Sequence, residues 1–196
     1  MRNLLLASSS PYRQDLLNRL GLPFRTASPE IDESPLPGEL PGALAVRLAS
    51  EKARALADAW PDTLIIGSDQ VAVLPDNTLL NKPGDHATAC RQLGMCSGRR
   101  VRFLTGLAVL DTRTGILKTC CEPFEVRFRE LSAQEAEHYL RKEQPYDCAG
   151  SFRMEGLGIA LFSAMSGRDP NSLIGLPLIA LVDLLRQFGI NPLLAP

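Results

Sequence analysis

The chain has 196 residues, of which 45% are hydrophobic and 22% charged, an ordinary composition for a soluble globular protein. A chain of this length can build a core that needs no disulfide or structural metal. Lys and Arg number 21 against 22 Asp and Glu, so the formal net charge is −1. A near-neutral protein has no global basic field, so we expect it to bind neither a nucleic acid polymer nor an anionic membrane. A net charge near zero does not exclude a local pocket for a small anion.

We expect neither an export signal nor a disulfide framework in this sequence. The apolar stretch over residues 4–7 is shorter than the roughly 7–15 residues of a signal-peptide core, and no stretch approaches the ~20 apolar residues of a membrane span. We therefore expect a cytoplasmic protein. Its five cysteines form no Cys-x-x-Cys pair and its two histidines stand apart, so neither a disulfide framework nor a zinc site is expected.

Predicted strands and helices alternate along the chain. The first half should contain a strand over 3–7, a helix over 11–20, a strand over 24–27, a proline-rich loop over 28–41, a helix over 43–60, and strand segments over 64–67 and 71–74. The second half should contain a helix over 85–93, a hairpin over 101–110 and 116–128, a helix over 132–142, a strand over 156–163 and a helix over 177–188. Ser10 and Ser132 are natural caps of two of these helices, and Gly21 and Gly189 natural stops. The alternation predicts an α/β fold, and the hairpin predicts a mixed sheet.

Three segments carry groups that attract anions. Ser8 and Ser10 lie between the first strand and the start of the first helix, where free backbone N–H groups and the helix dipole favour an anion. Arg13 adds a bidentate phosphate donor, although a plain helix cap with a surface arginine is the alternative. Lys52 lies within the apolar stripe of its helix, so it must snorkel to solvent or meet a negative partner. Lys82 has no local structural role, but an exposed lysine needs none.

Three acidic residues complete the set. Asp69 ends what looks like an apolar strand, the position at which α/β folds bind ligands, and it can act as a general base, bind a metal or lie in a solvated turn. Glu33 lies in the long proline-rich loop, and long ordered loops tend to be functional. Glu155 is flanked by glycines, which form either a plain turn or a close approach to a flat ligand. Together, the cations and acids fit a polyphosphate with a divalent metal.

Short motifs follow one another in a specific order and spacing. They are Leu-Ala-Ser-Ser-Ser-Pro-Tyr-Arg over 6–13, Ile-Asp-Glu over 31–33, Lys-Ala over 52–53, Gly-Ser-Asp over 67–69, Lys-Pro over 82–83, Ser-Gly-Arg over 97–99, Thr-Gly over 105–106, Ala-Gly over 149–150, Gly-Leu-Gly over 156–158, and Asn171 with Ile-Gly-Leu-Pro-Leu over 174–178. Over nearly its whole length, the chain resembles the Maf family of nucleoside triphosphate pyrophosphatases.

The resemblance implies one Maf-like domain over residues 1–196. Its α/β fold would have a mixed twisted sheet flanked by helices, with two lobes around a nucleotide cleft, as in Maf and ITPase-like proteins. The family is cytoplasmic and often homodimeric, and it cleaves nucleoside triphosphates between the α and β phosphates with a divalent metal cation, Mg²⁺ or Mn²⁺. Asp69 would be the catalytic base, and Glu33 and Asp69 would hold the metal. The phosphates would be bound by Ser8, Ser10, Arg13, Lys52 and Lys82.

Three positions depart from the common family pattern and bear on substrate specificity. Tyr12 replaces an arginine, Gln70 a threonine and Glu155 a glutamine, and together they resemble the subgroup that acts on 7-methyl-GTP rather than on dTTP or UTP. Because methylation at N7 makes guanine cationic, Tyr12 can stack on the ring with a cation–π attraction of about 0.5–2 kcal/mol. Glu155 can accept hydrogen bonds from the ring N1–H and the exocyclic amine.

We therefore expect hydrolysis of 7-methyl-GTP to 7-methyl-GMP and pyrophosphate. Asp69 would orient or deprotonate the attacking water, and whether it also binds the metal is left open. The activity would keep modified nucleotides out of nucleic acids, and the resemblance implies a link to cell-division arrest. Two alternatives stand beside this expectation: a dTTP or UTP pyrophosphatase of the same family, and a non-catalytic nucleotide-binding regulator of cell division.

Overall fold

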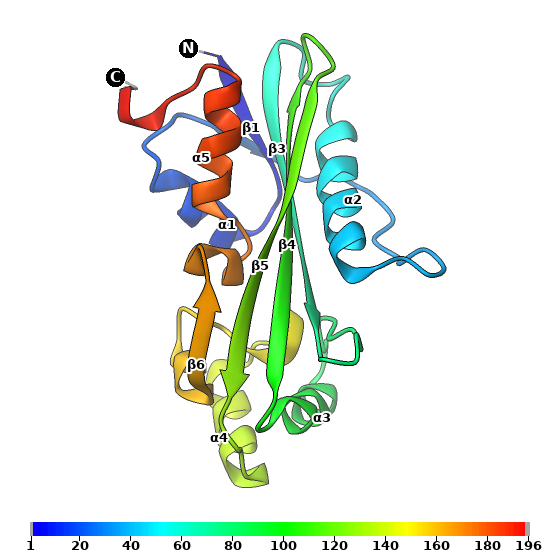
Figure 1. Ribbon diagram of the computed structural model, residues 1–196, viewed down its shortest axis with the longest axis vertical. Coiled ribbons are helices and arrows are strands. Elements are labelled where there is room, and N and C mark those ends of the chain that lie inside the picture. The colour runs from blue at the N-terminus through cyan, green and yellow to red at the C-terminus, as the bar shows by residue number, and fades with distance from the viewer. Residues whose placement is uncertain (1, 195–196) are drawn as a thin grey trace.

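The computed structural model of the protein describes residues 2–194, which form one mixed six-stranded sheet flanked by helices (Figure 1). The strands are β1 (Asn3–Ala7), β2 (Arg25–Ala27), β3 (Thr63–Val73), β4 (Arg100–Asp111), β5 (Leu117–Phe128) and β6 (Phe162–Gly167), in the spatial order β2-β1-β3-β4-β5-β6. The helices are α1 (Pro11–Asn18), α2 (Pro41–Arg54), α3 (His86–Cys96), α4 (Ala133–Glu143) and α5 (Leu178–Gln187). β1 pairs in parallel with β2 and β3, and the remaining neighbours are antiparallel. The predicted α/β fold with a mixed sheet is confirmed.

Alternate side chains of the sheet feed cores on its two faces. Leu4 and Leu6 of β1 pack in a cluster with α1 and α5, whereas Leu5 and Ala7 pack against α2. Figure 1 shows the same arrangement, with α1 and α5 on one side of the long strands and α2 on the other. A separate cluster lies at the far end of the sheet, under α3 and α4. The division of a single domain into two lobes stays a prediction.

The sequence placed two element boundaries wrongly near the predicted site. β3 is one continuous strand, so Asp69 lies inside it rather than at its end. The strand continues because it pairs with β4 without a break from Leu64 to Val73. The buried Ser68 hydroxyl is satisfied within it: Ser68 Oγ is 3.0 Å from the carbonyl oxygen of Gly106 and 2.9 Å from that of Gly175. The strand expected over 156–163 is also wrong, because Leu157–Leu161 forms a 3₁₀ turn (η2) and β6 begins only at Phe162.

The helix expected over 43–60 is shorter than predicted. α2 begins at Pro41 and ends at Arg54, after which Ala57 N–H bonds to the carbonyl of Arg54 in a tighter turn. The helix caps predicted at Ser10 and Ser132 are confirmed: Ser10 accepts a hydrogen bond from Arg13 N–H, and Ser132 and Glu135 form a reciprocal capping box.

Within residues 2–194, no helix combines the length and the hydrophobicity that crossing a membrane requires.

Two glycines let α2 lie directly on the sheet. A Cβ on Gly67 would stand 2.0 Å from the carbonyl oxygen of Ala49, and a Cβ on Gly106 would stand 2.0 Å from that of Ala45. Both obstructing atoms belong to the α2 backbone, which cannot move aside as a flexible side chain can. The close approach fixes the height of α2 above β3 and therefore the position of Lys52, one turn beyond Leu48.

Gly106→Ala should lower the free energy of unfolding by about 1–3 kcal/mol or more, because the added methyl group overpacks the contact between α2 and β4. Gly94→Ala in α3 is the matched control, since nothing lies within 4 Å of its added Cβ. Alanine should stabilise that helix by roughly 0.5–1 kcal/mol. Urea denaturation measures both changes, and equal stabilities for the two variants would contradict the close approach of α2.

Candidate active site

A cavity of about 760 Å³ opens at the middle of the sheet, beside the β1–α1 loop. That volume lies within the range of roughly 300–1,000 Å³ that is usual for ligand pockets. Every residue that the sequence singled out for substrate or metal lines it: Ser8, Ser10, Tyr12, Arg13, Glu33, Lys52, Asp69, Gln70, Lys82 and Glu155. These side chains come from six separate stretches of chain, so the packing of the fold brings them together.

A buried lysine joins two carboxylates at the centre of this cavity. Lys52 Nζ of α2 lies 2.6 Å from Asp69 Oδ1 of β3 and 2.5 Å from Glu33 Oε1 of the proline-rich loop. Lys52 and Asp69 are each only 8% exposed, so Lys52 meets negative partners instead of snorkelling to solvent. Partial burial acts to raise the pKa of the Glu33 carboxyl, but the hydrogen bond and charge of Lys52 outweigh it and lower that pKa. The centre therefore holds two carboxylates and one ammonium group.

An arginine on α2 anchors the loop that carries Glu33. Arg47 Nε lies 2.7 Å from Glu39 Oε1, and Arg47 Nη2 donates to the carbonyl oxygen of Ser34 at 3.0 Å. Arg47 also pairs with Glu51 one turn along the helix, at 3.1 Å. These contacts hold the loop against α2, as does the ion pair of Glu33 with Lys52.

The β1–α1 loop and Arg13 form the part of the cavity suited to an anion. Ser8 Oγ accepts a hydrogen bond from Ser10 N–H at 3.1 Å, and Ser10 caps α1. Arg13 Nε donates to the carbonyl oxygen of Gly175 at 2.8 Å. Among residues 2–194, no side chain or carbonyl accepts from its two terminal guanidinium nitrogens, so both can bind a ligand. Burial lowers the pKa of this guanidinium, while Asp69 and Glu33 act to raise it. Lys82 is exposed at the rim and acts electrostatically on Glu33.

Tyr12 and Glu155 mark another part of the same cavity. The guanidinium carbon of Arg153 lies 5.6 Å from the centre of the Tyr12 ring, within cation–π range. Burial raises the pKa of the Tyr12 hydroxyl; Arg153 acts to lower it, and Glu155 contributes to raising it, so the three side chains interact electrostatically. Glu155 is exposed to the cavity.

Gln70 is largely committed to the protein itself. Its Nε2 donates to the carbonyl oxygen of Ser172 at 2.5 Å and lies 3.3 Å from Thr105 Oγ1. Thr105 Oγ1 donates to the same carbonyl at 2.9 Å. Gln70 therefore ties β3 to the turn η3 (Pro170–Leu173), and it lines the cavity with its amide nitrogen already engaged.

Arg153 is one of the cavity residues that the sequence did not single out, and it contacts Tyr12. Its buried Nε has no hydrogen-bond partner within residues 2–194. The available signal was its place two residues before Glu155 in the same glycine-rich segment. The glycines of that segment have a different role from the one considered: a Cβ on Gly156 would stand 2.3 Å from Glu143 Oε2, and one on Gly158 would stand 2.2 Å from the Arg153 carbonyl oxygen. They permit tight packing within the protein, and neither lines the cavity.

The cavity thus combines anion-binding groups with a pair of carboxylates, as enzymes of phosphoryl chemistry do. Residues 3–188 match the family model described as Maf-like protein, and the chain belongs to the Maf family. It is 58% identical to a curated 7-methyl-GTP pyrophosphatase of Alcanivorax borkumensis, over 96% of this chain and 95% of that protein. It is also 58% identical to a 7-methyl-GTP pyrophosphatase of Pseudomonas syringae pv. tomato, over 97% and 99% of the two chains.

A distant solved structure shares the fold. The Ham1 protein of Staphylococcus aureus superimposes with a TM-score of 0.54 over 95% of this chain and 99% of that one, at 12% sequence identity. At that identity the likeness concerns the architecture alone. It agrees with the expected ITPase-like arrangement of a mixed sheet flanked by helices.

Proposed function

We propose that the protein hydrolyses 7-methyl-GTP to 7-methyl-GMP and pyrophosphate. The observation that carries the proposal is Tyr12, whose ring already holds a cation, the Arg153 guanidinium, at 5.6 Å. Glu155 lines the same cavity, as does the Lys52 centre. An aromatic face and a carboxylate suit a cationic base, and basic groups suit its triphosphate. The relatives at 58% identity bear the name of this activity.

The proposed mechanism uses groups that the structure places together. Arg13, Lys82 and the Ser8–Ser10 loop bind the triphosphate. Its negative charge gives Lys52 a further partner, which frees the carboxylate of Asp69 from part of its ion pair. Asp69 then accepts a proton from a water molecule as the water oxygen attacks the α-phosphorus. The bond from the α-phosphorus to the bridging oxygen breaks, and pyrophosphate leaves.

The carboxylates of Glu33 and Asp69 also fit a divalent cation. One oxygen of each lies 2.5 Å and 2.6 Å from the Lys52 ammonium, so the two carboxylates lie close enough together to share a cation beside that ammonium. Carboxylate oxygens are the ligands that Mg²⁺ and Mn²⁺ prefer. Such an ion would neutralise part of the charge on the leaving pyrophosphate.

A side-by-side turnover assay tests the proposal. We expect a higher kcat/KM for 7-methyl-GTP than for GTP, dTTP or UTP, with pyrophosphate as a product when Mg²⁺ or Mn²⁺ is present. Faster hydrolysis of dTTP or UTP would assign the protein to the pyrimidine branch of the family. Nucleotide binding without pyrophosphate release would assign it to a non-catalytic regulator. The cytoplasmic location, the homodimer and the link to cell division stay predictions.

Arg153→Met should increase the preference for 7-methyl-GTP over GTP. The guanidinium competes with the cationic base for the face of Tyr12 and repels it, whereas it does not repel neutral guanine in this way. Removing a cation–π competitor worth about 0.5–2 kcal/mol should raise the kcat/KM ratio of the two substrates roughly 2- to 30-fold. Arg91→Met on the exposed side of α3 is the control. A lower ratio in Arg153→Met would show that the arginine helps to hold the base.

A further inference from the structure

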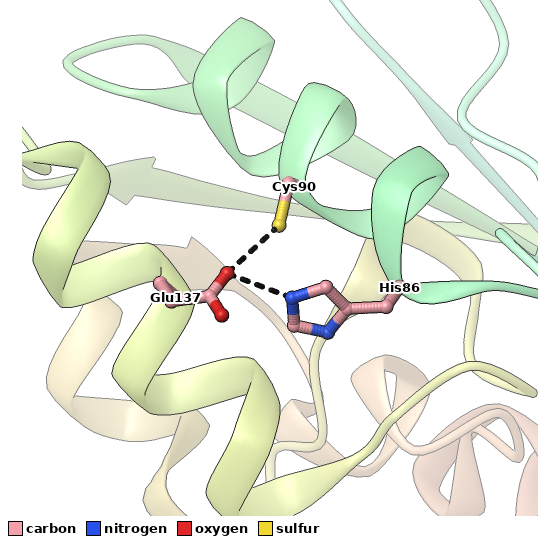
Figure 2. Close-up of side chains that lie close together, drawn as sticks. All are labelled: His86, Cys90 and Glu137. Carbon is pink, nitrogen blue, oxygen red and sulfur yellow. Dashed lines mark hydrogen bonds and ion pairs between the residues drawn. The ribbon is translucent and has the colours of Figure 1, made fainter.

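A second group of potential ligands lies outside the cavity, between α3 and α4. His86 and Cys90 stand one turn apart on the same face of α3, and Glu137 faces them from α4 (Figure 2). One ligand atom from each of the three lies within 4.8 Å of the other two. None of the three lines the cavity. The expectation that His86 stands apart from other potential ligands is therefore wrong. Glu137 is 51 residues from His86 in the sequence, and only the packing of α4 against α3 brings the two side chains together.

We propose that His86, Cys90 and Glu137 form a binding site for Zn²⁺, separate from the cavity that takes the nucleotide. Nitrogen, sulfur and one carboxylate oxygen are the donors that Zn²⁺ binds in proteins. Mg²⁺ prefers oxygen ligands alone. The His86–Cys90–Glu137 site should therefore bind Mg²⁺ poorly, whereas the carboxylates of Glu33 and Asp69 suit it. Three protein ligands leave the fourth tetrahedral position for a water molecule.

The three side chains already converge on one atom. His86 Nε2 lies 2.7 Å from Glu137 Oε2, and the Cys90 thiol donates to the same oxygen at 3.6 Å. These contacts are what such a site shows when protons stand in place of the metal. On binding, two protons would pass to solvent, the thiol proton and the proton between Nε2 and Oε2, and the lone pairs of Nε2, Sγ and Oε2 would turn to the ion. The His86 and Glu137 side chains are 35% and 38% exposed, which leaves a path for the ion to enter.

A second set of contacts orients the ligands. Tyr146 Oη lies 2.9 Å from His86 Nδ1 and donates to the carbonyl oxygen of Leu140 at 3.4 Å. Since the tyrosine hydroxyl has only one proton to donate, it accepts from Nδ1–H, which leaves Nε2 as the ligating nitrogen. Arg141 Nε donates to Glu137 Oε1 at 2.5 Å, which leaves Oε2 for the metal. Partners of this kind commonly orient zinc ligands in proteins.

Cobalt substitution tests the site on the whole protein. After treatment with a chelator and a reductant, the wild type should bind one equivalent of Co²⁺ with a thiolate-to-cobalt charge-transfer absorption, and Zn²⁺ should displace it. Cys90→Ser should lose that absorption, whereas Cys120→Ser on β5 should keep it. Glu33→Gln should also keep it, because Glu33 lies in the nucleotide cavity and is not one of the three proposed ligands. Absence of the band in the wild type, or its persistence in Cys90→Ser, would overturn the proposal.

Thermal unfolding tests the site independently of the cobalt absorption, which a variant could lose simply by folding poorly. Because the ligands join α3 to α4, Zn²⁺ in excess should raise the Tm of the wild type. Glu137→Gln keeps the size of the side chain and should weaken Zn²⁺ binding by about 10- to 100-fold or more. Its Tm should then respond little to the same Zn²⁺ concentration. An equal rise of Tm in Glu137→Gln and the wild type would count against the site.

Discussion

Asp69→Asn should lower kcat for 7-methyl-GTP by about 100- to 10,000-fold, which is the contribution typical of a general base. Asparagine keeps the shape of the side chain but cannot accept the proton of the attacking water at neutral pH. Lys52 keeps Glu33 as its ionic partner at 2.5 Å, so the substitution leaves no unpaired buried ammonium. Substrate affinity and folding should therefore change far less than turnover. Steady-state kinetics and binding of a non-hydrolysable analogue separate these effects.

Asp85→Asn is the matched control for that experiment. Asp85 caps α3 by accepting from Thr88 N–H at 2.8 Å, and asparagine caps helices about as well. Asp85 does not line the cavity, so its variant should turn over the substrate at nearly the wild-type rate. A kcat above one tenth of the wild-type value in Asp69→Asn would contradict the role of Asp69 as the base.

Glu155→Gln should lower kcat/KM for 7-methyl-GTP by roughly 10- to 100-fold, the loss expected when a hydrogen-bonded charge is removed. The cationic base loses both a charge-assisted acceptor and an attractive neighbouring charge. Neutral GTP loses only the charge-assisted hydrogen-bond acceptor, so its kcat/KM should fall less. A glutamine side chain both donates and accepts, so hydrolysis of UTP and dTTP should hold or rise. The ratio of kcat/KM values across the four substrates is the measurement.

Glu125→Gln on β5 provides the same change of charge away from the cavity. Glu125 pairs with the exposed Arg100 at 3.2 Å, and exposed pairs of this kind contribute only about 0–1 kcal/mol. Its substrate ratios should match those of the wild type. If Glu155→Gln lowered the kcat/KM of every nucleotide equally, Glu155 would serve the cavity in general and not the recognition of a cationic base.

Local chemistry made much of the fold predictable. Ser10 and the Ser132–Glu135 pair act on backbone groups within three residues of themselves, so their capping roles could be recognised from the sequence and are confirmed. The element types were also predictable, because apolar periodicity reports which side chains face a core. The errors near residues 68 and 157 lie where the distant strand β4 pairs with β3 beyond Gly67, and where Gly158 packs closely against the Arg153 carbonyl.

The membership of the site followed from motifs, but its internal arrangement did not. All of the predicted residues line the same cavity. The motifs could indicate this because anion-binding groups and carboxylates bind a polyphosphate only when they lie together. Nothing in the spacing showed that Lys52 would join Glu33 to Asp69, or that Gln70 would be engaged by the Ser172 carbonyl. Both contacts depend on how α2 and η3 pack against β3.

From the sequence alone, a near-neutral α/β protein could be predicted, with a charged site that we expect to take one nucleotide rather than a polymer. The tertiary structure decided which charges meet. Gly67 and Gly106 let α2 come close enough for Lys52 to reach Asp69. The chain before Gly156 places the Arg153 guanidinium over the Tyr12 ring. Contacts between residues far apart in the chain are set by the packing of whole elements, and local periodicity carries no record of that packing.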